Sequence, residues 1–372
     1  MSSTLPQVNP ALYDQQLANK AERLRQQFAQ FQPPELEVFA SPPSHYRLRT
    51  EFRIWHEGED LFYVMFEVGE DPKKDRTLVR MDQYPVAGTA INRLMPLLLD
   101  SIRDQPLLRR KLFQVEFLTT LSNQVLITLI YHRPLDDAWE TAARELQQQL
   151  GVMLIGRSRG QKRVLQQDFV LETLQVNGRS LTYKQVEGSF TQPNPWMGQK
   201  MLEWALDASR PTTDETPRDL VELYCGNGNF TLALAPNFRR VLGTEISRTS
   251  VAAAQYNITA NNISNVRIER MAAEDFSVAL DNPTSAEAIK FELQDYDFST
   301  VLVDPPRAGL DAATLAQVQR FERILYISCN PDTLADNLNT LTRTHRVERF
   351  AFFDQFPYTH HAECGVYLVK EA

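Results

Sequence analysis

Short apolar runs alternate with amphipathic segments through the second half of the chain. The apolar runs predict strands near 219–223, 240–245, 265–270, 299–303 and 322–328. The segments between them have helical spacing and predict helices near 229–237, 248–261, 311–320 and 331–343. This alternation is typical of a parallel sheet flanked by helices.

The last two predicted strands, 346–354 and 365–370, are separated by only about ten residues. Because this connection is too short for a crossover helix, the two strands should run antiparallel and close the sheet. Seven strands with a reversed last strand form the architecture of class I methyltransferases, which is Rossmann-like. The predicted fold class of this half is therefore α/β.

The first half begins with a helix that we predict at 11–32. Leu17, Ala21, Leu24 and Phe28 share one face of this helix, and the two prolines that follow it end the run. The apolar face predicts that the helix packs against another part of the chain.

Strand-like pieces then follow one another, with one helix predicted at 137–150, and together they indicate an α+β domain. We therefore expect an N-terminal helix that packs on the catalytic domain, an α+β domain, and a methyltransferase domain. The expected boundaries are 1–36, 37–185 and 186–372.

Composition excludes several classes of protein. A chain of 372 residues, 43% of them hydrophobic, is long enough for two domains. No stretch approaches about 18 consecutive apolar residues and the first residues do not resemble a leader, so we expect a cytoplasmic protein. The net charge of −8 argues against a wholesale coating of nucleic acid. The three cysteines have no C-x-x-C spacing, so we expect no disulfide framework and no metal site.

A glycine-rich turn, VELYCGNGNF at 221–230, lies between a predicted strand and a predicted helix. Gly226 and Gly228 permit close approach of a ligand, but Thr231 stands where a dinucleotide fingerprint needs a third glycine. Glu245 ends the next strand, where a carboxylate can accept hydrogen bonds from ribose hydroxyls. The loop suits a nucleoside without a pyrophosphate, such as S-adenosylmethionine, although a purely structural turn would look the same.

A second polar site is VDPPRAG at 303–309, where Asp304 ends the fourth predicted strand. Ligands of open α/β sheets bind at this edge. Methyltransferases that act on amino groups carry an aromatic residue after the paired prolines, whereas this chain has Arg307. The motif therefore indicates chemistry other than amino methylation, unless Asp-Pro-Pro only ends the strand.

Cys329 follows the fifth predicted strand, on the same edge as Asp304. Asn330 can cap the next helix and Pro331 suits its first turn, so the helix N-terminus should lower the pKa of the thiol. A lone cysteine is otherwise most often a small buried apolar residue.

A thiolate beside a methyl donor suits methylation of carbon 5 of a pyrimidine, which reacts only after a nucleophile adds to carbon 6. A base must then remove the carbon-5 proton. Glu363, immediately before the last strand, has aromatic neighbours that should raise its pKa. His360 and His361 are rival bases, whereas Cys364 should be packed in the interior.

Eight motifs spread over nearly the whole chain resemble those of bacterial tRNA (uracil-5-)-methyltransferases. They are SHYRLRTEFRIWH, FLTTLSNQ, SFTQPN, ELYCGNGNF, SVAAAQYNI, VDPPR, ILYISCNP and DQFPYTHHAECGV. Related enzymes of ribosomal RNA usually carry a four-cysteine iron–sulfur site, which three scattered cysteines cannot build. The resemblance is therefore to the branch without a cluster.

The resemblance implies Cys329 as nucleophile and Glu363 as proton acceptor. It implies S-adenosylmethionine as cofactor and the T arm of tRNA as partner, with uridine 54 as the target. The tmRNA molecule, which carries a similar loop, is a further candidate substrate, and no membrane or obligate protein partner is implied. The implied cofactor contacts are Gln192, Tyr224, Asn229, Glu245 and Asp304, with Phe190 supporting the same pocket.

The α+β domain is the expected RNA-binding domain, and three basic segments are candidates for the contact. These are 154–165, 108–113 with Phe113, and a strand on which Arg47, Arg49 and Arg53 alternate. Basic residues beside an aromatic ring suit phosphate contact and base stacking, although each cluster alone is more often a solvated surface.

Two other functions fit parts of the pattern. RNA cytosine-5 methyltransferases also add a cysteine to carbon 6, but they place Pro-Cys in the fourth motif, where this chain has Pro-Pro-Arg. Alternatively, the protein opens and folds tRNA, and methylation is secondary. Methyl transfer by a Cys329→Ala variant distinguishes catalysis from binding.

Overall fold

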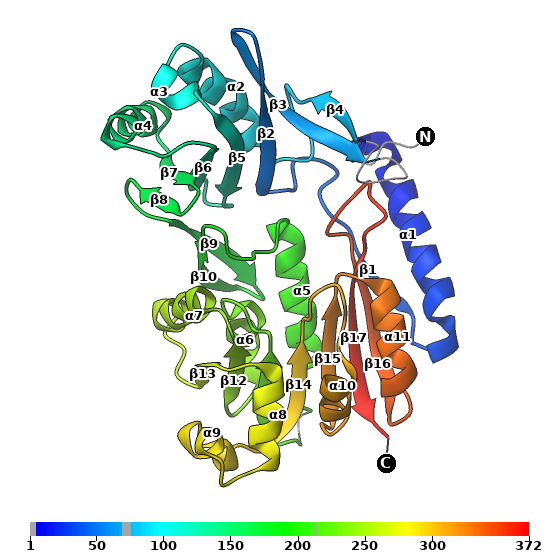
Figure 1. Cartoon of the computed structure of the whole chain (residues 1–372). Helices are drawn as coiled ribbons and strands as arrows, with labels where there is room; N and C mark the ends of the chain where they lie inside the picture. Colours follow the sequence, from blue (N-terminus) through cyan, green and yellow to red (C-terminus); the bar gives the residue numbers. More distant parts are fainter. Residues whose placement is uncertain (1–4, 69–75, 213, 372) are drawn as a thin grey trace. The chain divides into compact units, whose positions relative to one another are not determined.

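The computed structural model describes residues 5–68, 76–212 and 214–371 (Figure 1). The chain forms two compact units, and it passes between them more often than the expected boundaries at 36 and 185 allow. The first unit comprises Met1–Ala11, Pro42–Thr173 and Gln185–Pro195. The second unit comprises Leu12–Ser41, Leu174–Lys184 and Trp196–Ala372.

The first unit is an α+β structure, as predicted, around a seven-stranded sheet of order β4-β3-β2-β5-β6-β7-β8. Its strands are β2 (Arg49–Glu57), β3 (Asp60–Val68), β4 (Arg76–Arg80), β5 (Leu112–Thr119), β6 (Val125–Tyr131), β7 (Met153–Ser158) and β8 (Gln161–Val164). Its helices are α2 (Thr89–Arg103), α3 (Pro106–Arg109) and α4 (Asp137–Leu150). Two further strands, β9 (Phe169–Val176) and β10 (Arg179–Val186), form a separate two-stranded sheet, of which Leu174–Lys184 belongs to the second unit.

Helix α4 has the predicted bounds because its ends are encoded locally. The side chain of Asp136 accepts a hydrogen bond from the backbone N–H of Trp139 at 2.8 Å and caps the helix. Gly151 ends it in the left-handed conformation. Trp139 is fully buried against Gly156, where a Cβ atom would lie 2.1 Å from the indole ring.

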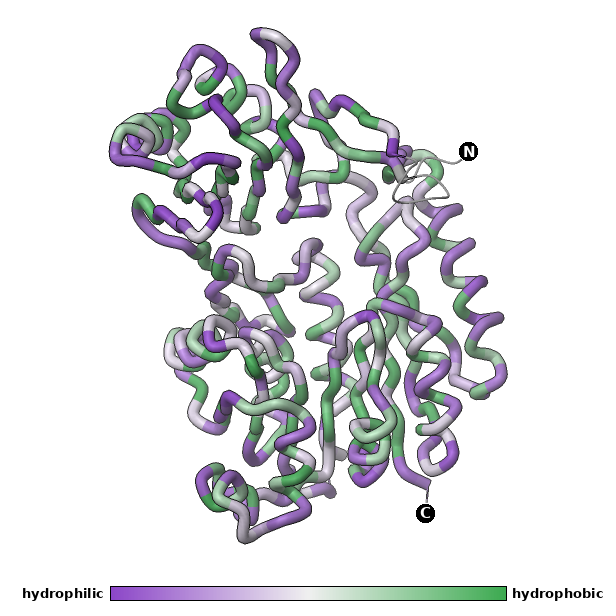
Figure 2. Tube along the Cα trace, in the orientation of Figure 1, coloured by the Kyte–Doolittle hydropathy of each residue, from purple (hydrophilic) through white to green (hydrophobic). Residues whose placement is uncertain are grey.

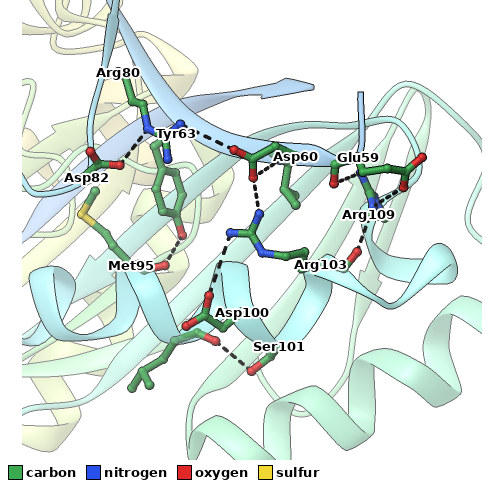
Figure 3. Close-up of polar contacts among 12 residues, drawn as sticks. Glu59, Asp60, Tyr63, Arg80, Asp82, Met95, Asp100, Ser101, Arg103 and Arg109 are labelled. Atoms are coloured by element: carbon green, nitrogen blue, oxygen red, sulfur yellow. Dashed lines mark hydrogen bonds and ion pairs between the residues drawn. The ribbon is translucent and has the colours of Figure 1, made fainter. Parts of the chain in front are cut away.

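Helix α2 was not predicted because Pro96, a residue that usually ends helices, lies inside it. Tertiary contacts hold it in place. The hydroxyl of Tyr63 on β3 donates a hydrogen bond to the carbonyl of Met95 at 3.0 Å, and Arg103 pairs with Asp60 at the start of β3 (Figure 3). Packing therefore outweighs local propensity here.

The second unit is built on an eight-stranded sheet of order β1-β16-β17-β15-β14-β11-β12-β13. Its strands are β1 (Leu36–Phe39), β11 (Asp219–Leu223), β12 (Val241–Glu245), β13 (Val266–Arg270), β14 (Phe298–Val303), β15 (Arg323–Ser328), β16 (His345–Phe353) and β17 (Glu363–Lys370). The predicted class I architecture is confirmed, because β17 runs antiparallel to both of its neighbours. The eighth strand was not predicted: β1 extends the edge by pairing parallel to β16.

Helices accompany this sheet, and those predicted from helical spacing are present. They are α1 (Tyr13–Phe28), α5 (Pro195–Ala208), α6 (Asn229–Leu234), α7 (Arg248–Ala260), α8 (Ala273–Asp281), α9 (Ala286–Lys290), α10 (Ala312–Val318) and α11 (Pro331–Leu341). The sequence patterns missed α5, α8 and α9; the last two are too short to show clear periodicity. Figure 2 shows hydrophobic residues concentrated along the central strands, with hydrophilic residues alternating along the helices.

Helix α1 packs its predicted apolar face onto the core of the second unit. Ala21, Leu24 and Phe28 are buried there, and the ring of Phe28 lies 4.8 Å from that of Phe350 on β16. Figure 1 shows α1 running beside α11. Among the residues that the structure describes, no helix is both long enough and apolar enough to cross a membrane.

Candidate active site

The candidate site lies at one edge of the eight-stranded sheet. Strands β11, β12, β14 and β15 are parallel, so the residues that follow their carboxyl ends meet at the same edge. These residues are the glycine-rich loop, Asp304 and Cys329, and Glu245 is the last residue of β12. The reversed strand β17 begins at this edge with Glu363, because its direction is opposite.

Strand register places Glu363 beside Cys329. In the antiparallel pair of β15 and β17, Ile327 lies opposite Gly365 and Ser328 lies opposite Cys364. One further step along the same register brings the position of Cys329 opposite that of Glu363. A parallel last strand would begin at the other edge, so the reversal is what brings the two predicted catalytic residues together.

The pKa of Cys329 is raised, and the prediction that its helix N-terminus lowers it is wrong. Asn330 does cap α11 as predicted, accepting a hydrogen bond from the backbone N–H of Asp332 at 3.2 Å. However, burial, and then the like charges of Glu363 and Asp304, raise the pKa of the half-buried thiol to about 11. The thiol is therefore protonated at neutral pH before a substrate binds.

The pKa of Glu363 is raised, as predicted. Its side chain is buried beside the position of Phe353 on β16, and burial followed by the charge of Asp304 raises its pKa well above the usual value. Burial also raises the pKa of Asp304 to about 7. Two neighbouring buried carboxyl groups resist simultaneous ionisation, so Glu363 binds a proton strongly, as an acceptor of a substrate proton should.

The rival bases make other contacts. A guanidinium nitrogen of Arg307 lies 3.1 Å from Nδ1 of His361, and the His360 side chain is exposed. Cys364 is fully buried, as predicted, and burial raises the pKa of its thiol. The geometry therefore favours Glu363 over either histidine as the base nearest Cys329.

The glycine-rich loop has a backbone shaped for a ligand. Tyr224, Gly226 and Gly228 have φ values of 63°, 57° and 79°, in the left-handed region. The carboxylate of Glu245 accepts hydrogen bonds from the N–H of Gly226 at 3.0 Å and from the N–H of Ser247 at 2.7 Å. Both carboxylate oxygens are thereby fixed in direction, and each keeps a lone pair for a ribose hydroxyl.

Space for a ligand is present at Gly226. A Cβ atom built there would meet nothing within 4 Å, whereas one at Gly228 would lie 2.6 Å from the side chain of Leu232. The first glycine thus borders open space and the second is required by packing. Asn229 begins α6, and its carbonyl accepts a hydrogen bond from the hydroxyl of Tyr183 at 2.9 Å. These residues fit the nucleoside of S-adenosylmethionine.

One supporting pair under the loop was missed by sequence reasoning. Glu222 on β11 is buried and accepts a hydrogen bond from the hydroxyl of Thr231, the residue at the position of the absent third glycine. Burial raises the pKa of Glu222 to about 8. The sequence did contain a signal for this pair. Thr231 replaces the third glycine of a dinucleotide fingerprint, and a threonine at that position can hold the loop through its side chain.

The predicted residues fall into two groups. The second unit brings most of them to one sheet edge: Tyr224, Asn229, Glu245, Asp304, Cys329 and Glu363. Gln192 and the exposed Phe190 belong to the first unit, in the segment 185–195, so their contact with a cofactor stays a prediction. Within the described ranges, no group of three His, Cys, Asp or Glu residues is placed to hold a metal ion.

Comparison with known proteins agrees with this geometry. The sequence model of the family tRNA (Uracil-5-)-methyltransferase matches residues 12–371. The chain is 58% identical over 369 residues to a tRNA/tmRNA (uracil-C(5))-methyltransferase of Chromohalobacter salexigens, covering 99% of this chain and 98% of that protein. It is 54% identical over 373 residues to the protein of the same name from Vibrio vulnificus, covering 98% and 99%.

A solved structure has the same fold. The tRNA (uracil-54, C5)-methyltransferase of Pyrococcus abyssi, crystallised with S-adenosyl-L-homocysteine, superposes with a TM-score of 0.71 at 21% identity and covers 96% of this chain and 83% of that one. The fold, the shared sheet edge and the full-length sequence match agree. The chain belongs to the tRNA (uracil-5-)-methyltransferase family.

Proposed function

We propose that this protein transfers a methyl group from S-adenosylmethionine to carbon 5 of uridine 54 in the T loop of tRNA, and to the similar loop of tmRNA. One observation carries the proposal: the register of β17 sets Glu363 beside Cys329 at the edge that also holds Glu245. A nucleophile and a base side by side are what methylation of this carbon requires. A tRNA substrate places the reaction in the cytoplasm.

The two residues divide the reaction between them. Sγ of Cys329 loses its proton to water and bonds to carbon 6, which makes carbon 5 nucleophilic. S-adenosylmethionine supplies the electrophilic methyl group. Glu363 then takes the proton from carbon 5, the double bond between carbons 5 and 6 re-forms, and the bond from carbon 6 to sulfur breaks. The raised pKa of Glu363 suits it to hold this proton.

The raised pKa of Cys329 determines when this thiol can become a nucleophile. A thiol with a pKa of about 11 is a poor nucleophile at neutral pH until its surroundings change. Its activation therefore depends on the bound substrate, and Arg307, whose charge lowers this pKa, is the favourable neighbour. This arrangement keeps the half-buried nucleophile from reacting before RNA binds.

The RNA is proposed to dock on a stack of side chains in the first unit. The guanidinium of Arg53 on β2 lies 3.9 Å from the ring centroid of Phe113, and the ring of His132 stacks on Phe113 at 3.8 Å. A guanidinium nitrogen of Arg53 is buried and has no hydrogen-bond partner within the described part of the chain. Trp55, 45% exposed, follows on the same strand. An aromatic ring and a cation suit an unstacked loop base and its phosphate.

Most of the basic segment 154–165 is neutralised within the first unit. Arg157 donates two hydrogen bonds to the carboxylate of Glu187, both at 2.6 Å, and Lys162 lies 2.6 Å from Asp168. Arg163 is likewise paired, with acidic residues of α4. These ion pairs make the stack around Phe113 the better candidate for RNA contact.

A mechanism-based trap tests the proposed chemistry. With labelled methyl donor and a T-arm RNA containing 5-fluorouridine, carbon 5 has no proton to lose, so the RNA should stay bonded to Cys329. Peptide mapping identifies the residue. The Cys329→Ala variant should form no adduct and no methylated product while it still binds tRNA. Methylation by that variant, or an adduct on another residue, would overturn the assignment.

A further inference from the structure

Helix α1 carries a polar stripe beside its apolar one. Gln16, Lys20, Arg23 and Gln27 follow one another at intervals of four, three and four residues, so they lie on one face of the helix. The apolar face explains why α1 packs on the second unit, but it does not explain this second stripe. Its partners are two segments of the sheet edge described above.

The first partner is the loop that joins β16 to β17. Nζ of Lys20 lies 2.8 Å from Oδ1 of Asp354 and donates to the carbonyl of Phe356 at 2.8 Å. Gln16 donates to the other carboxylate oxygen of Asp354 at 2.7 Å and accepts a hydrogen bond from the N–H of Tyr358 at 3.2 Å. The loop is therefore tied to α1 along its first half.

The stripe continues toward both candidate catalytic residues. Arg23 donates to the carbonyl of His360 at 2.8 Å, three residues before Glu363. Gln27 donates to Oδ1 of Asp332 at 2.7 Å, in the first turn of the helix that follows Cys329. A single helix thus touches the chain next to the proposed base and next to the proposed nucleophile.

We propose that the polar stripe of α1 is a positioning device, which sets Glu363 against the substrate proton and holds the first turn of α11 behind Cys329. Gln16, Lys20, Arg23 and Gln27 are its positioning residues; none of them is proposed to touch the substrate. The inference rests on the catalytic roles proposed above for Cys329 and Glu363.

The burial of the central ion pair supports a role in positioning. Lys20 is 7% exposed and Asp354 is fully buried. Burying two charges is seldom stabilising relative to apolar side chains, because both lose their hydration. What such a pair does provide is a defined geometry, with Asp354 accepting hydrogen bonds from two residues of one helix. Asp354 is the first residue of the loop that leads from β16 to β17, the strand that begins with the proposed base.

Helix α1 offers matched controls for an experiment. Arg25 and Gln26 are exposed, and both contact Glu22 within the same helix. Arg23→Ala and Gln27→Ala can therefore be compared with Arg25→Ala and Gln26→Ala, which make the same chemical changes away from the sheet edge. The measurements are kcat, the Kd for tRNA, and covalent protein–RNA adduct formed with ordinary uridine. Glu363→Gln serves as the reference for a disabled base.

Arg23→Ala and Gln27→Ala should lower kcat about tenfold without changing the Kd for tRNA, because small misplacements of a reacting group are costly. If proton removal is slowed, the adduct should accumulate on ordinary uridine with Arg23→Ala, as with Glu363→Gln. Gln27→Ala, which acts near the nucleophile, should instead slow adduct formation. A loss of folded protein would lower activity but would not cause adduct to accumulate. Lys20→Met should show the largest effect if it folds, and Arg23→Ala and Gln27→Ala carry the test if it does not.

The controls separate the possible failures. If Glu363→Gln accumulates adduct but Arg23→Ala and Gln27→Ala turn over like their controls, the positioning role is wrong and the proposed catalytic roles remain. If Glu363→Gln accumulates no adduct, the proposed role of Glu363 fails first. If the Arg25 and Gln26 variants lose kcat equally, α1 contributes only general stability and the inference is overturned.

Discussion

At the scale of the residue, the site is defined by groups whose ionisation is shifted by burial. Cys329, Asp304 and Glu363 all bind protons more strongly than in water, and burial is the main cause for each. A carboxyl group of this kind is a better proton acceptor, whereas a thiol of this kind is a poorer nucleophile until its surroundings change. The same desolvation thus prepares the base and restrains the nucleophile.

The pKa of Cys329 leads to a prediction about its reactivity in the free protein. Alkylation of this thiol by iodoacetamide should rise between about pH 9 and 11, because the reactive thiolate forms only as pH approaches the pKa of about 11. Glu363→Gln removes the largest like charge and should move this profile to lower pH. Mass spectrometry of the modified peptide measures the rate, and the buried Cys225 and Cys364 serve as unreactive controls. A profile that rises near pH 8 would contradict the raised pKa.

At the scale of the element, the loop between β11 and α6 owes its shape to left-handed residues and a fixed carboxylate. Gly226 combines a positive φ with open space, so its lack of a side chain serves a ligand as well as the backbone. Gly178, in the turn between β9 and β10, has the same combination away from this loop. Comparing Gly226 with Gly178 therefore distinguishes the conformational role of a glycine from its role in leaving space for a ligand.

Gly226→Ala and Gly178→Ala should each cost about 1 kcal/mol of unfolding free energy, because alanine is strained in the left-handed region. Only Gly226→Ala should also weaken binding of S-adenosylmethionine, by roughly tenfold, since its methyl group enters the space beside the carboxylate of Glu245. Thermal unfolding and titration calorimetry measure the two effects. Equal cofactor affinity in both variants would place the ligand elsewhere.

At the scale of the whole molecule, the two units carry different parts of the task. The second unit holds the candidate catalytic residues, and the first unit holds the stack of Arg53, Phe113 and His132 that is proposed to bind RNA. The chain returns to the first unit at 185–195, the segment of Gln192, before it enters α5. Variants of the catalytic groups in the second unit should therefore change methyl transfer and leave RNA binding intact. Variants of the stack in the first unit should weaken RNA binding and leave methyl transfer intact.

Phe113→Ala should weaken tRNA binding by roughly 1–3 kcal/mol, because the ring holds Arg53 and His132 in the stack proposed to contact RNA. Arg53→Ala should reduce the dependence of binding on salt by about one counterion, measured from about 50 to 300 mM. Arg163→Ala, whose charge is already paired with α4, should change neither. None of the three should prevent methyl transfer at saturating tRNA. Equal losses at Arg163 and Arg53 would shift the RNA surface toward the segment 154–165.

Much of the fold follows from local patterns. The alternation of apolar runs with helical segments predicted β11, β12, β14 and β15 to within one residue, because their ends coincide with polar or glycine-rich turns. The short connection before β17 predicted its reversal. Their places at the ends of predicted strands, the chemistry of carbon-5 methylation and the family motifs identified Cys329 and Glu363 as candidates. These features depend on neighbours in the sequence, so the sequence by itself determined them.

Tertiary structure decided what depends on distant groups. The register that sets Glu363 beside Cys329, and the burial that raises the pKa of the thiol against the effect of its helix, arise only when separate strands assemble. The pairing of Arg157 with Glu187 likewise neutralises part of a basic segment that the sequence had suggested for RNA. Desolvation and ion pairing depend on which groups become neighbours in the folded structure, and local sequence patterns do not encode those contacts.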